Sequence, residues 1–195
     1  MKKARLIAMI LALTMLSAVL SGCGIVKIIP KGQEAQYTGQ KVFDASAEAA
    51  SDWENVRNEI VGNAKPLADV MAEEVSGNAY SVSFSGTVEE YNTDSPKGYL
   101  RIAVEGVDTE VQVQVGKVFS GTTVRDCQTF KGYGSFTNQT EWSAYAKTVN
   151  KEVLTNVVEP LGDLSALVGK TVEVVGCYTP STGKVVVTPV SLTVQ

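Results

Sequence analysis

The chain has 195 residues, 17 of them basic and 21 acidic, and it contains no histidine, so its formal net charge is −4. An acidic chain is not suited to coating nucleic acid, and a chain without histidine has no imidazole metal ligands and no Ser-His or Cys-His dyad. Three cysteines cannot form a paired CxxC metal clip, and neither a GxGxxG motif nor a P-loop occurs. We therefore predict a non-catalytic protein that binds no nucleic acid and has no metal or other cofactor.

Residues 1–22 have the features of a lipoprotein signal peptide. Three basic residues precede an apolar run over residues 6–20. This run has the length of the hydrophobic region of a signal peptide rather than of a membrane-spanning helix. The run ends in the lipobox-like sequence LSGC, so we expect cleavage before Cys23 and attachment of acyl chains, such as palmitate, through that residue. The alternative is an ordinary secretory signal or short anchor with an incidental cysteine. The expected location is the extracytoplasmic side of the cell membrane, either the periplasmic side or the outer surface, where the protein is held by lipid.

The segment that follows divides into a tether and a helical part. Residues 23–43 are mixed in composition and are expected to be a membrane-proximal tether. In residues 44–77, apolar side chains recur every three or four positions, which predicts two short helices. Asp44 or Ser46 is the expected N-cap of the first helix, and Pro66 is expected in the first turn of the second.

Residues 78–195 predict a small β-barrel. Apolar and polar side chains alternate over five stretches, which indicates strands buried on one side. These stretches are residues 80–89, 100–105, 111–115, 171–178 and 184–194. An amphipathic helix ending at Pro160 lies between the third and fourth strands, and this element order is that of an OB-type barrel. We therefore expect a mainly β, α+β fold, in which a five-stranded antiparallel OB-like barrel is capped by this helix and residues 44–77 pack on it. A flat sheet with helices on one face is the alternative, and Pro189 predicts an edge or a bulge in the last strand.

Residues 116–150 join the third strand to the helix and carry most of the unusual polar residues. The first part reads as extended or looped chain, pinned to the core by Val118, Phe119, Val124 and Phe130. Asn138 and Glu141 have the spacing of a capping box, which predicts that the helix begins here.

This stretch also resembles a known family. The matching residues are Gly116, Gly121, Thr122, Arg125, Asp126, Phe136, Thr137, Asn138, Gln139 and Asn150. They are similar to the signature region of predicted periplasmic lipoproteins of unknown function, often encoded beside sugar-type ABC transporters, and the similarity extends more weakly from Cys23 to the C-terminus. The resemblance is compatible with two functions. We favour a lipid-anchored accessory protein that contacts ABC transporter subunits, because the aromatic residues are few and most fit core positions. The alternative is a module that captures a small solute, such as a sugar, at the barrel mouth.

The charged pair Arg125-Asp126 allows two interpretations. In an extended segment neighbouring side chains point to opposite faces, so we do not expect the two to pair with each other. One or both could fix the loop internally, which is favoured because long loops need internal hydrogen bonds. Alternatively, polar and aromatic side chains of this stretch form a surface that contacts a ligand or partner. The residues of this surface would be Thr122, Arg125, Asp126, Asn138, Gln139 and Trp142. Aromatic walls for a solute pocket could come from Tyr133, Phe136 and Trp142.

Cys127 and Cys177 are a candidate disulfide. If Cys23 carries lipid, they are the two remaining thiols of a chain that faces an oxidising compartment. A bridge would close a loop of about 50 residues and stabilise the fold by about 4 kcal/mol in the chain-entropy model. The alternative is two small buried apolar side chains. In the family that the chain resembles, small residues such as alanine usually occupy both positions, which favours a pair. Asp126 is expected to raise the pKa of Cys127, so a reactive thiolate is the least expected role.

Overall fold

The computed structural model describes residues 29, 37, 39, 42–73, 77–180 and 183–195. The chain divides into two compact units, Met1–Phe43 and Asp44–Gln195, and all the elements discussed below belong to the second. Cys23, the expected signal peptide and most of the expected tether lie outside the described residues, so lipidation of Cys23 stays a prediction. Among the described helices, none combines the length and the apolar character that crossing a membrane requires.

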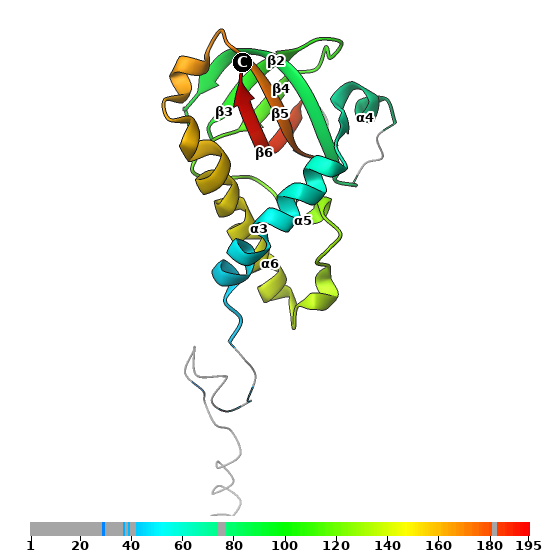
Figure 1. The fold of residues 1–195 in the computed structure, drawn as a ribbon, viewed down its shortest axis with the longest axis vertical. Coiled ribbons are helices and arrows are strands. Elements are labelled where there is room, and N and C mark those ends of the chain that lie inside the picture. The colour runs from blue at the N-terminus through cyan, green and yellow to red at the C-terminus, as the bar shows by residue number, and fades with distance from the viewer. Residues whose placement is uncertain (1–28, 30–36, 38, 40–41, 74–76, 181–182) are drawn as a thin grey trace, which may run out of the picture. The chain divides into compact units, whose positions relative to one another are not determined.

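Five strands of the second unit close into a barrel (Figure 1). They are β2 (Tyr80–Asn92), β3 (Tyr99–Val104), β4 (Val111–Gln114), β5 (Thr171–Tyr178) and β6 (Val185–Val194). Their order is β2-β3-β4-β6-β5, and β2 also pairs with β5, which completes the barrel. The predicted five-stranded OB-like barrel is confirmed. The expectation of purely antiparallel pairing is wrong at one place, because β4 and β6 are parallel. The chain reverses through a helix and β5 before β6 returns beside β4 in the same direction.

Alternating valines fill the interior of the barrel. Val82 and Val88 of β2 and Val172 and Val174 of β5 are fully or almost fully buried, as the period-two pattern predicts. The strand β6 has a bulge where its register against β5 shifts, next to Pro189, so the bulge predicted from this proline is confirmed.

Strand β4 departs from one-sided burial. All four of its residues are buried, including Gln112 and Gln114. The Gln114 amide donates to Thr188 Oγ1 at 2.7 Å and accepts from the backbone N–H of Ser120 at 2.7 Å. The chain after β4 therefore folds back over the strand, which a pattern of alternating polar residues does not reveal.

Two helices precede the barrel strands. Helix α3 (Ala45–Gly62) is capped by Asp44, whose carboxylate accepts two backbone N–H groups of the first turn, so this predicted cap is confirmed. Helix α4 (Leu67–Glu73) begins one residue later than expected. Pro66 instead belongs to the short strand β1 (Lys65–Pro66), which pairs in parallel with β2.

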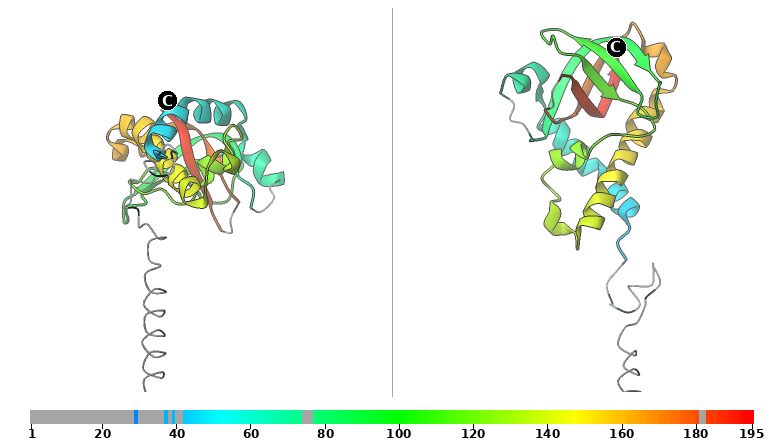
Figure 2. Two further views of the ribbon diagram at one scale, coloured as in Figure 1. Left: turned by 90° about the horizontal axis from the view of Figure 1, so that it is seen from below. Right: turned by 180° about the vertical axis from the view of Figure 1, so that it is seen from behind.

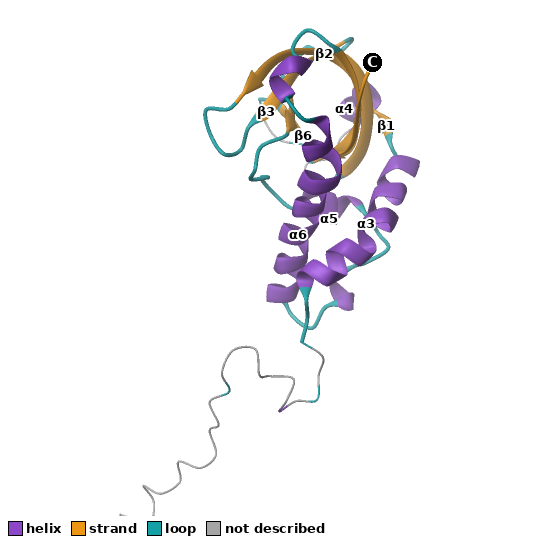
Figure 3. Ribbon diagram, turned by 60° about the vertical axis from the view of Figure 1, so that its left-hand side comes forward, coloured by secondary structure: helices purple, strands orange, loops and turns teal. Residues whose placement is uncertain are grey.

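The connection from β4 to β5 is mostly helical. Its elements are α5 (Thr123–Cys127), the 3₁₀ turn η1 (Tyr133–Ser135), α6 (Gln139–Val153), the π turn η2 (Leu154–Val158) and the 3₁₀ turns η3 (Glu159–Leu161) and η4 (Leu164–Leu167). Helices α3 and α6 pack against each other and extend together from one end of the barrel (Figures 2 and 3). The prediction of extended chain over α5 is wrong, because five residues are too few to show a helical period.

Candidate functional site

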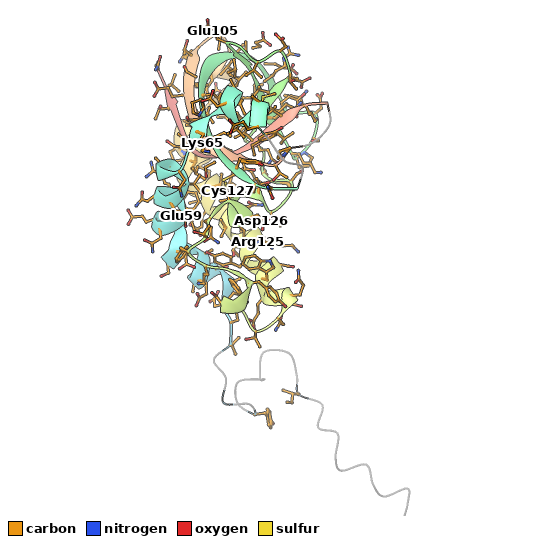
Figure 4. All side chains as sticks on the ribbon, turned by 90° about the vertical axis from the view of Figure 1, so that its right-hand side faces the viewer. Glu59, Lys65, Glu105, Arg125, Asp126 and Cys127 are labelled. Atoms are coloured by element: carbon orange, nitrogen blue, oxygen red, sulfur yellow. The ribbon has the colours of Figure 1, made fainter. Side chains whose placement is uncertain are left out.

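Arg125 and Asp126 form an ion pair on helix α5 (Figure 4). The guanidinium of Arg125 donates to Asp126 Oδ1 through Nε at 2.7 Å and through Nη2 at 2.5 Å. The hydroxyl of Thr122 donates to the other carboxylate oxygen, Oδ2, at 2.5 Å. The expectation that the two charged residues do not pair is therefore wrong. It assumed an extended backbone, whereas the helical backbone of α5 lets the neighbouring side chains meet.

A row of aromatic rings lies beside this pair. The Arg125 guanidinium sits 4.1 Å from the centre of the Trp142 ring, a cation–π contact. Trp142 is 6.1 Å from Tyr133 and 5.1 Å from Phe136, and Phe136 is 5.1 Å from Tyr145, between ring centres. Tyr145 is fully buried and Tyr133 is exposed, so the row leads from the core to the surface.

Glu59 of α3 fixes the loop between α5 and η1. One of its carboxylate oxygens accepts from the Thr129 backbone N–H at 2.7 Å and from the Thr129 hydroxyl at 2.6 Å. The other oxygen accepts from the Phe130 N–H at 3.2 Å. These bonds tie the loop backbone to α3 while leaving the Phe130 ring exposed. The expectation that Phe130 pins the loop to the core is therefore wrong, and the same holds for the exposed Val118, whereas Val124 is buried as expected.

Lys131 adds two ion pairs to this attachment of the loop to α3. Its Nζ lies 2.5 Å from a carboxylate oxygen of Glu48 and 2.6 Å from Asp52 Oδ2, and the Tyr145 hydroxyl donates to the same Asp52 oxygen at 2.9 Å. Burial disfavours the charged form of Lys131, but the hydrogen bonds to Asp52 and Glu48 outweigh it and raise its pKa. Burial, followed by the Asp52 hydrogen bond, strongly raises the pKa of Tyr145. The neutral tyrosine and the charged lysine are therefore the stable forms.

Asn138 acts as the N-cap of α6. Its side-chain oxygen accepts the backbone N–H of Glu141 at 3.0 Å, which confirms the predicted cap. The Glu141 carboxylate reaches back to the N–H of Thr137 at 2.8 Å, one residue before the position that a capping box would use. Gln139 is exposed at the first position of the helix.

The predicted contact residues therefore divide into two groups. Thr122, Arg125, Asp126 and Trp142 come together in one set of contacts, whereas Asn138 and Gln139 lie at the start of α6, Asn138 as its cap and Gln139 exposed. The sequence did not point to the roles of Glu48, Asp52, Glu59 and Lys131. Their partners lie more than 60 residues away along the chain, so no local spacing reveals these contacts. A single lysine in a polar loop, Lys131, is the signal that could have pointed to them. Among the described residues, no three His, Cys, Asp or Glu side chains gather in a way that could hold a metal ion.

Cys127 and Cys177 meet at the junction of α5 and the barrel. The Sγ of Cys127 lies 3.2 Å from the Ser81 hydroxyl, and its thiol also hydrogen-bonds to Cys177; both thiols are free. The hydrogen bond from Cys177, opposed by burial and aided by the Ser81 bond, lowers the pKa of Cys127. Asp126 raises this pKa, as expected, but by less than the two hydrogen bonds lower it, so the pKa of Cys127 is lowered overall.

A hollow of about 600 Å³ lies under the turn between β2 and β3. Its lining includes Tyr91, Asp94, Lys117 and Glu159. None of the six contact residues predicted from the sequence lines this hollow.

The strand order and the helix between β4 and β5 define an OB-fold. The crystal structure of an OB-fold protein from Thermotoga maritima MSB8 is similar, with a TM-score of 0.61 over 80% of this chain and 100% of that chain, at 16% sequence identity. The family model described as predicted periplasmic lipoprotein (DUF2291) matches residues 13–193, and the chain belongs to this family. The resemblance to this lipoprotein family seen in the sequence is thereby confirmed, and the protein is extracytoplasmic. No curated protein matches the chain.

Proposed function

We propose that the protein is a lipid-anchored, non-catalytic accessory protein that docks on the membrane subunits of a sugar-type ABC transport system. The docking surface that we assign consists of Phe130 and Tyr133. Their side chains are 46% and 52% exposed, although each is large and largely apolar. The observation that supports this assignment is that Phe130 lies on the loop that Glu59 and Lys131 tie to α3, and that Tyr133 begins η1 directly after this loop.

A fixed loop with exposed aromatic rings suits protein recognition. Fully burying a large apolar side chain stabilises a contact by about 1.5–3 kcal/mol, and each of these two rings has about half of that still to gain. Since the loop is already ordered, binding would not have to order it again, which lowers the entropic cost of association. Arginine and aromatic side chains are enriched at interface centres. Trp142 contacts Tyr133, and the guanidinium of Arg125 lies over the Trp142 ring.

The alternative function is capture of a small solute such as a sugar. The hollow under the β2–β3 turn favours it, because Tyr91 could stack on a sugar ring and Asp94 and Glu159 could accept its hydroxyl groups. The polar side chains around α5 support it less, since they already bond to one another. Solute capture predicts a rise in the melting temperature with a sugar that the variant Tyr91→Ala loses.

Recovery of partners from membranes tests the docking proposal. Full-length tagged protein is crosslinked in native membranes, solubilised in detergent and purified, and transporter subunits are quantified by mass spectrometry. We expect the double variant Phe130→Ser, Tyr133→Ser to reduce their recovery by about tenfold, which corresponds to about 1.4 kcal/mol of lost affinity. Val168→Ser is the matched control, since Val168 is also an exposed apolar residue and directly follows η4, well after the end of α6 in the chain. Undiminished recovery with the double variant, or equal loss with the control, contradicts the proposal.

A further inference from the structure

Cys127 and Cys177 are 50 positions apart in the chain, yet both lie at the same residue, Ser81. Cys177 pairs directly with Ser81 across the antiparallel strands β5 and β2. Cys127 reaches the same place from the end of α5, where its Sγ lies 3.2 Å from the Ser81 hydroxyl and its thiol hydrogen-bonds to Cys177. The two thiols therefore meet over one cross-strand pair.

The position of Cys177 explains why Cys127 is its available partner. Residues alternate between the two faces of a strand, so Cys177 lies on the opposite face of β5 from the interior residues Val172 and Val174. On that face Glu173 is exposed, but Cys177 is completely buried. Both α3 and α5 pack on β5, and α5 brings Cys127 onto this end of the strand.

We propose that Cys127 and Cys177 are joined by an intramolecular disulfide in the extracytoplasmic compartment. The oxidant is a disulfide of that compartment, carried by a thiol-oxidising protein. The thiolate of one cysteine attacks one sulfur of this disulfide and releases the other as a thiol, which leaves a mixed disulfide. The second cysteine then attacks the sulfur of the first and releases the second thiol. Two thiols are oxidised to one disulfide, and the oxidant is reduced to two thiols.

The two cysteines have different parts in this exchange. Cys127 is partly exposed, and the hydrogen bonds from Cys177 and Ser81 lower its pKa, so it is the cysteine that meets the oxidant first. Cys177 is buried, which raises the pKa of its thiol, and it is already in contact with Cys127 for the second step. Its shielding also prevents a mixed disulfide from forming directly on Cys177.

The bond would tie the connection between β4 and α6 to the barrel wall. Without it, α5 is held to β5 by packing and to β2 by the contact between Cys127 and Ser81. With it, the start of the loop that carries Phe130 and Tyr133 is fixed covalently. The disulfide does not depend on the docking proposal, because its geometry involves neither of these two rings.

Thiol trapping on the full-length protein tests the disulfide. The protein is isolated from membranes of cells quenched in acid, denatured with an alkylating reagent present, and digested without reduction. We expect the peptides containing Cys127 and Cys177 to be linked, and the intact protein to be lighter by two hydrogens than after reduction. Alkylation of both thiols without reduction, or linkage of either cysteine to another molecule, would overturn the proposal.

Alanine variants distinguish a covalent disulfide from two thiols that are only close together. In Cys177→Ala, Cys127 should become alkylated without reduction, and in Cys127→Ala the same should hold for Cys177. A reducing agent should lower the urea midpoint of the wild-type protein and leave the midpoint of the double alanine variant unchanged. If reduction leaves the wild-type midpoint unchanged, or lowers both midpoints equally, no bond between these two residues stabilises the fold.

Discussion

Replacing Lys131 by methionine tests how the exposed loop is held. The substitution keeps an unbranched apolar stem but removes the charge that faces Glu48 and Asp52. The side chain of Asp52 is only 13% exposed, and after the change the donor that it keeps among the described residues is the Tyr145 hydroxyl. Removing one partner of a fully buried ion pair costs about 3–5 kcal/mol. Because Glu48 is 42% exposed and Asp52 keeps Tyr145, we expect a loss of about 2 kcal/mol.

Urea unfolding at neutral pH measures this loss, and a double-mutant cycle isolates its origin. Asp52→Asn removes the buried carboxylate charge, so Lys131→Met should cost less in that background, with a coupling of about 1 kcal/mol. Lys147→Met is the control, since Lys147 is exposed on α6 and should change stability by less than about 0.5 kcal/mol. A cost below about 0.5 kcal/mol for Lys131→Met, or strict additivity with Asp52→Asn, would refute the reasoning.

The same cluster predicts a loss of stability in alkali. The pKa values of Lys131 and Tyr145 are higher in the folded protein than their ordinary values of 10.5 and 10.0. As the pH rises, the unfolded chain therefore loses these two protons first. The stability that they contribute is fully present below about pH 10 and is lost as the pH rises through the folded-state values. The variant with both Lys131→Met and Tyr145→Phe should show a shallower alkaline decline than wild type, and parallel curves would contradict the assignment.

Three further changes have definite expected outcomes. Cys23→Ala should leave the protein uncleaved or release it from the membrane fraction, as seen by fractionation and intact mass; normal processing and anchoring would contradict lipidation. Asn138→Ala should cost about 1 kcal/mol in urea unfolding, since it removes the cap of α6, and no cost would contradict the cap. Gly116→Ala should cost about 2–3 kcal/mol, because its new methyl group would lie 2.3 Å from the backbone nitrogen of Gly98. The control Gly132→Ala has open space and should be nearly neutral; equal costs would contradict the close approach at Gly116.

The barrel could be predicted because its strands carry a strong local signal. Apolar residues, mostly valines, alternate with small or polar residues along β2, β3 and β5, and Pro189 marks the bulge. The cap of α6 was equally readable, since Asn138 and Glu141 stand at a fixed spacing. In these places, contacts between near neighbours decide the structure, and the local sequence contains them.

The site was less predictable because tertiary contacts determine it. Helix α5 is too short to show a period, so the Arg125–Asp126 pair was missed. The attachment of Lys131 to α3 spans about 80 residues of sequence, and no local spacing encodes it. Phe130 looked like a core residue by type, but Glu59 holds its backbone at the surface. An apolar residue in a loop indicates a core contact only where nothing else fixes the loop.

The most direct test of the proposed docking is photocrosslinking from the loop itself. A photoreactive phenylalanine analogue is incorporated at Tyr133, and in a second strain at Val168, both exposed in the full-length protein. Cells are irradiated, and adducts are identified by mass spectrometry. The account predicts adducts with subunits of a membrane transport system from position 133 and none from position 168. Adducts with such subunits from position 168 alone, or from neither position, would contradict it.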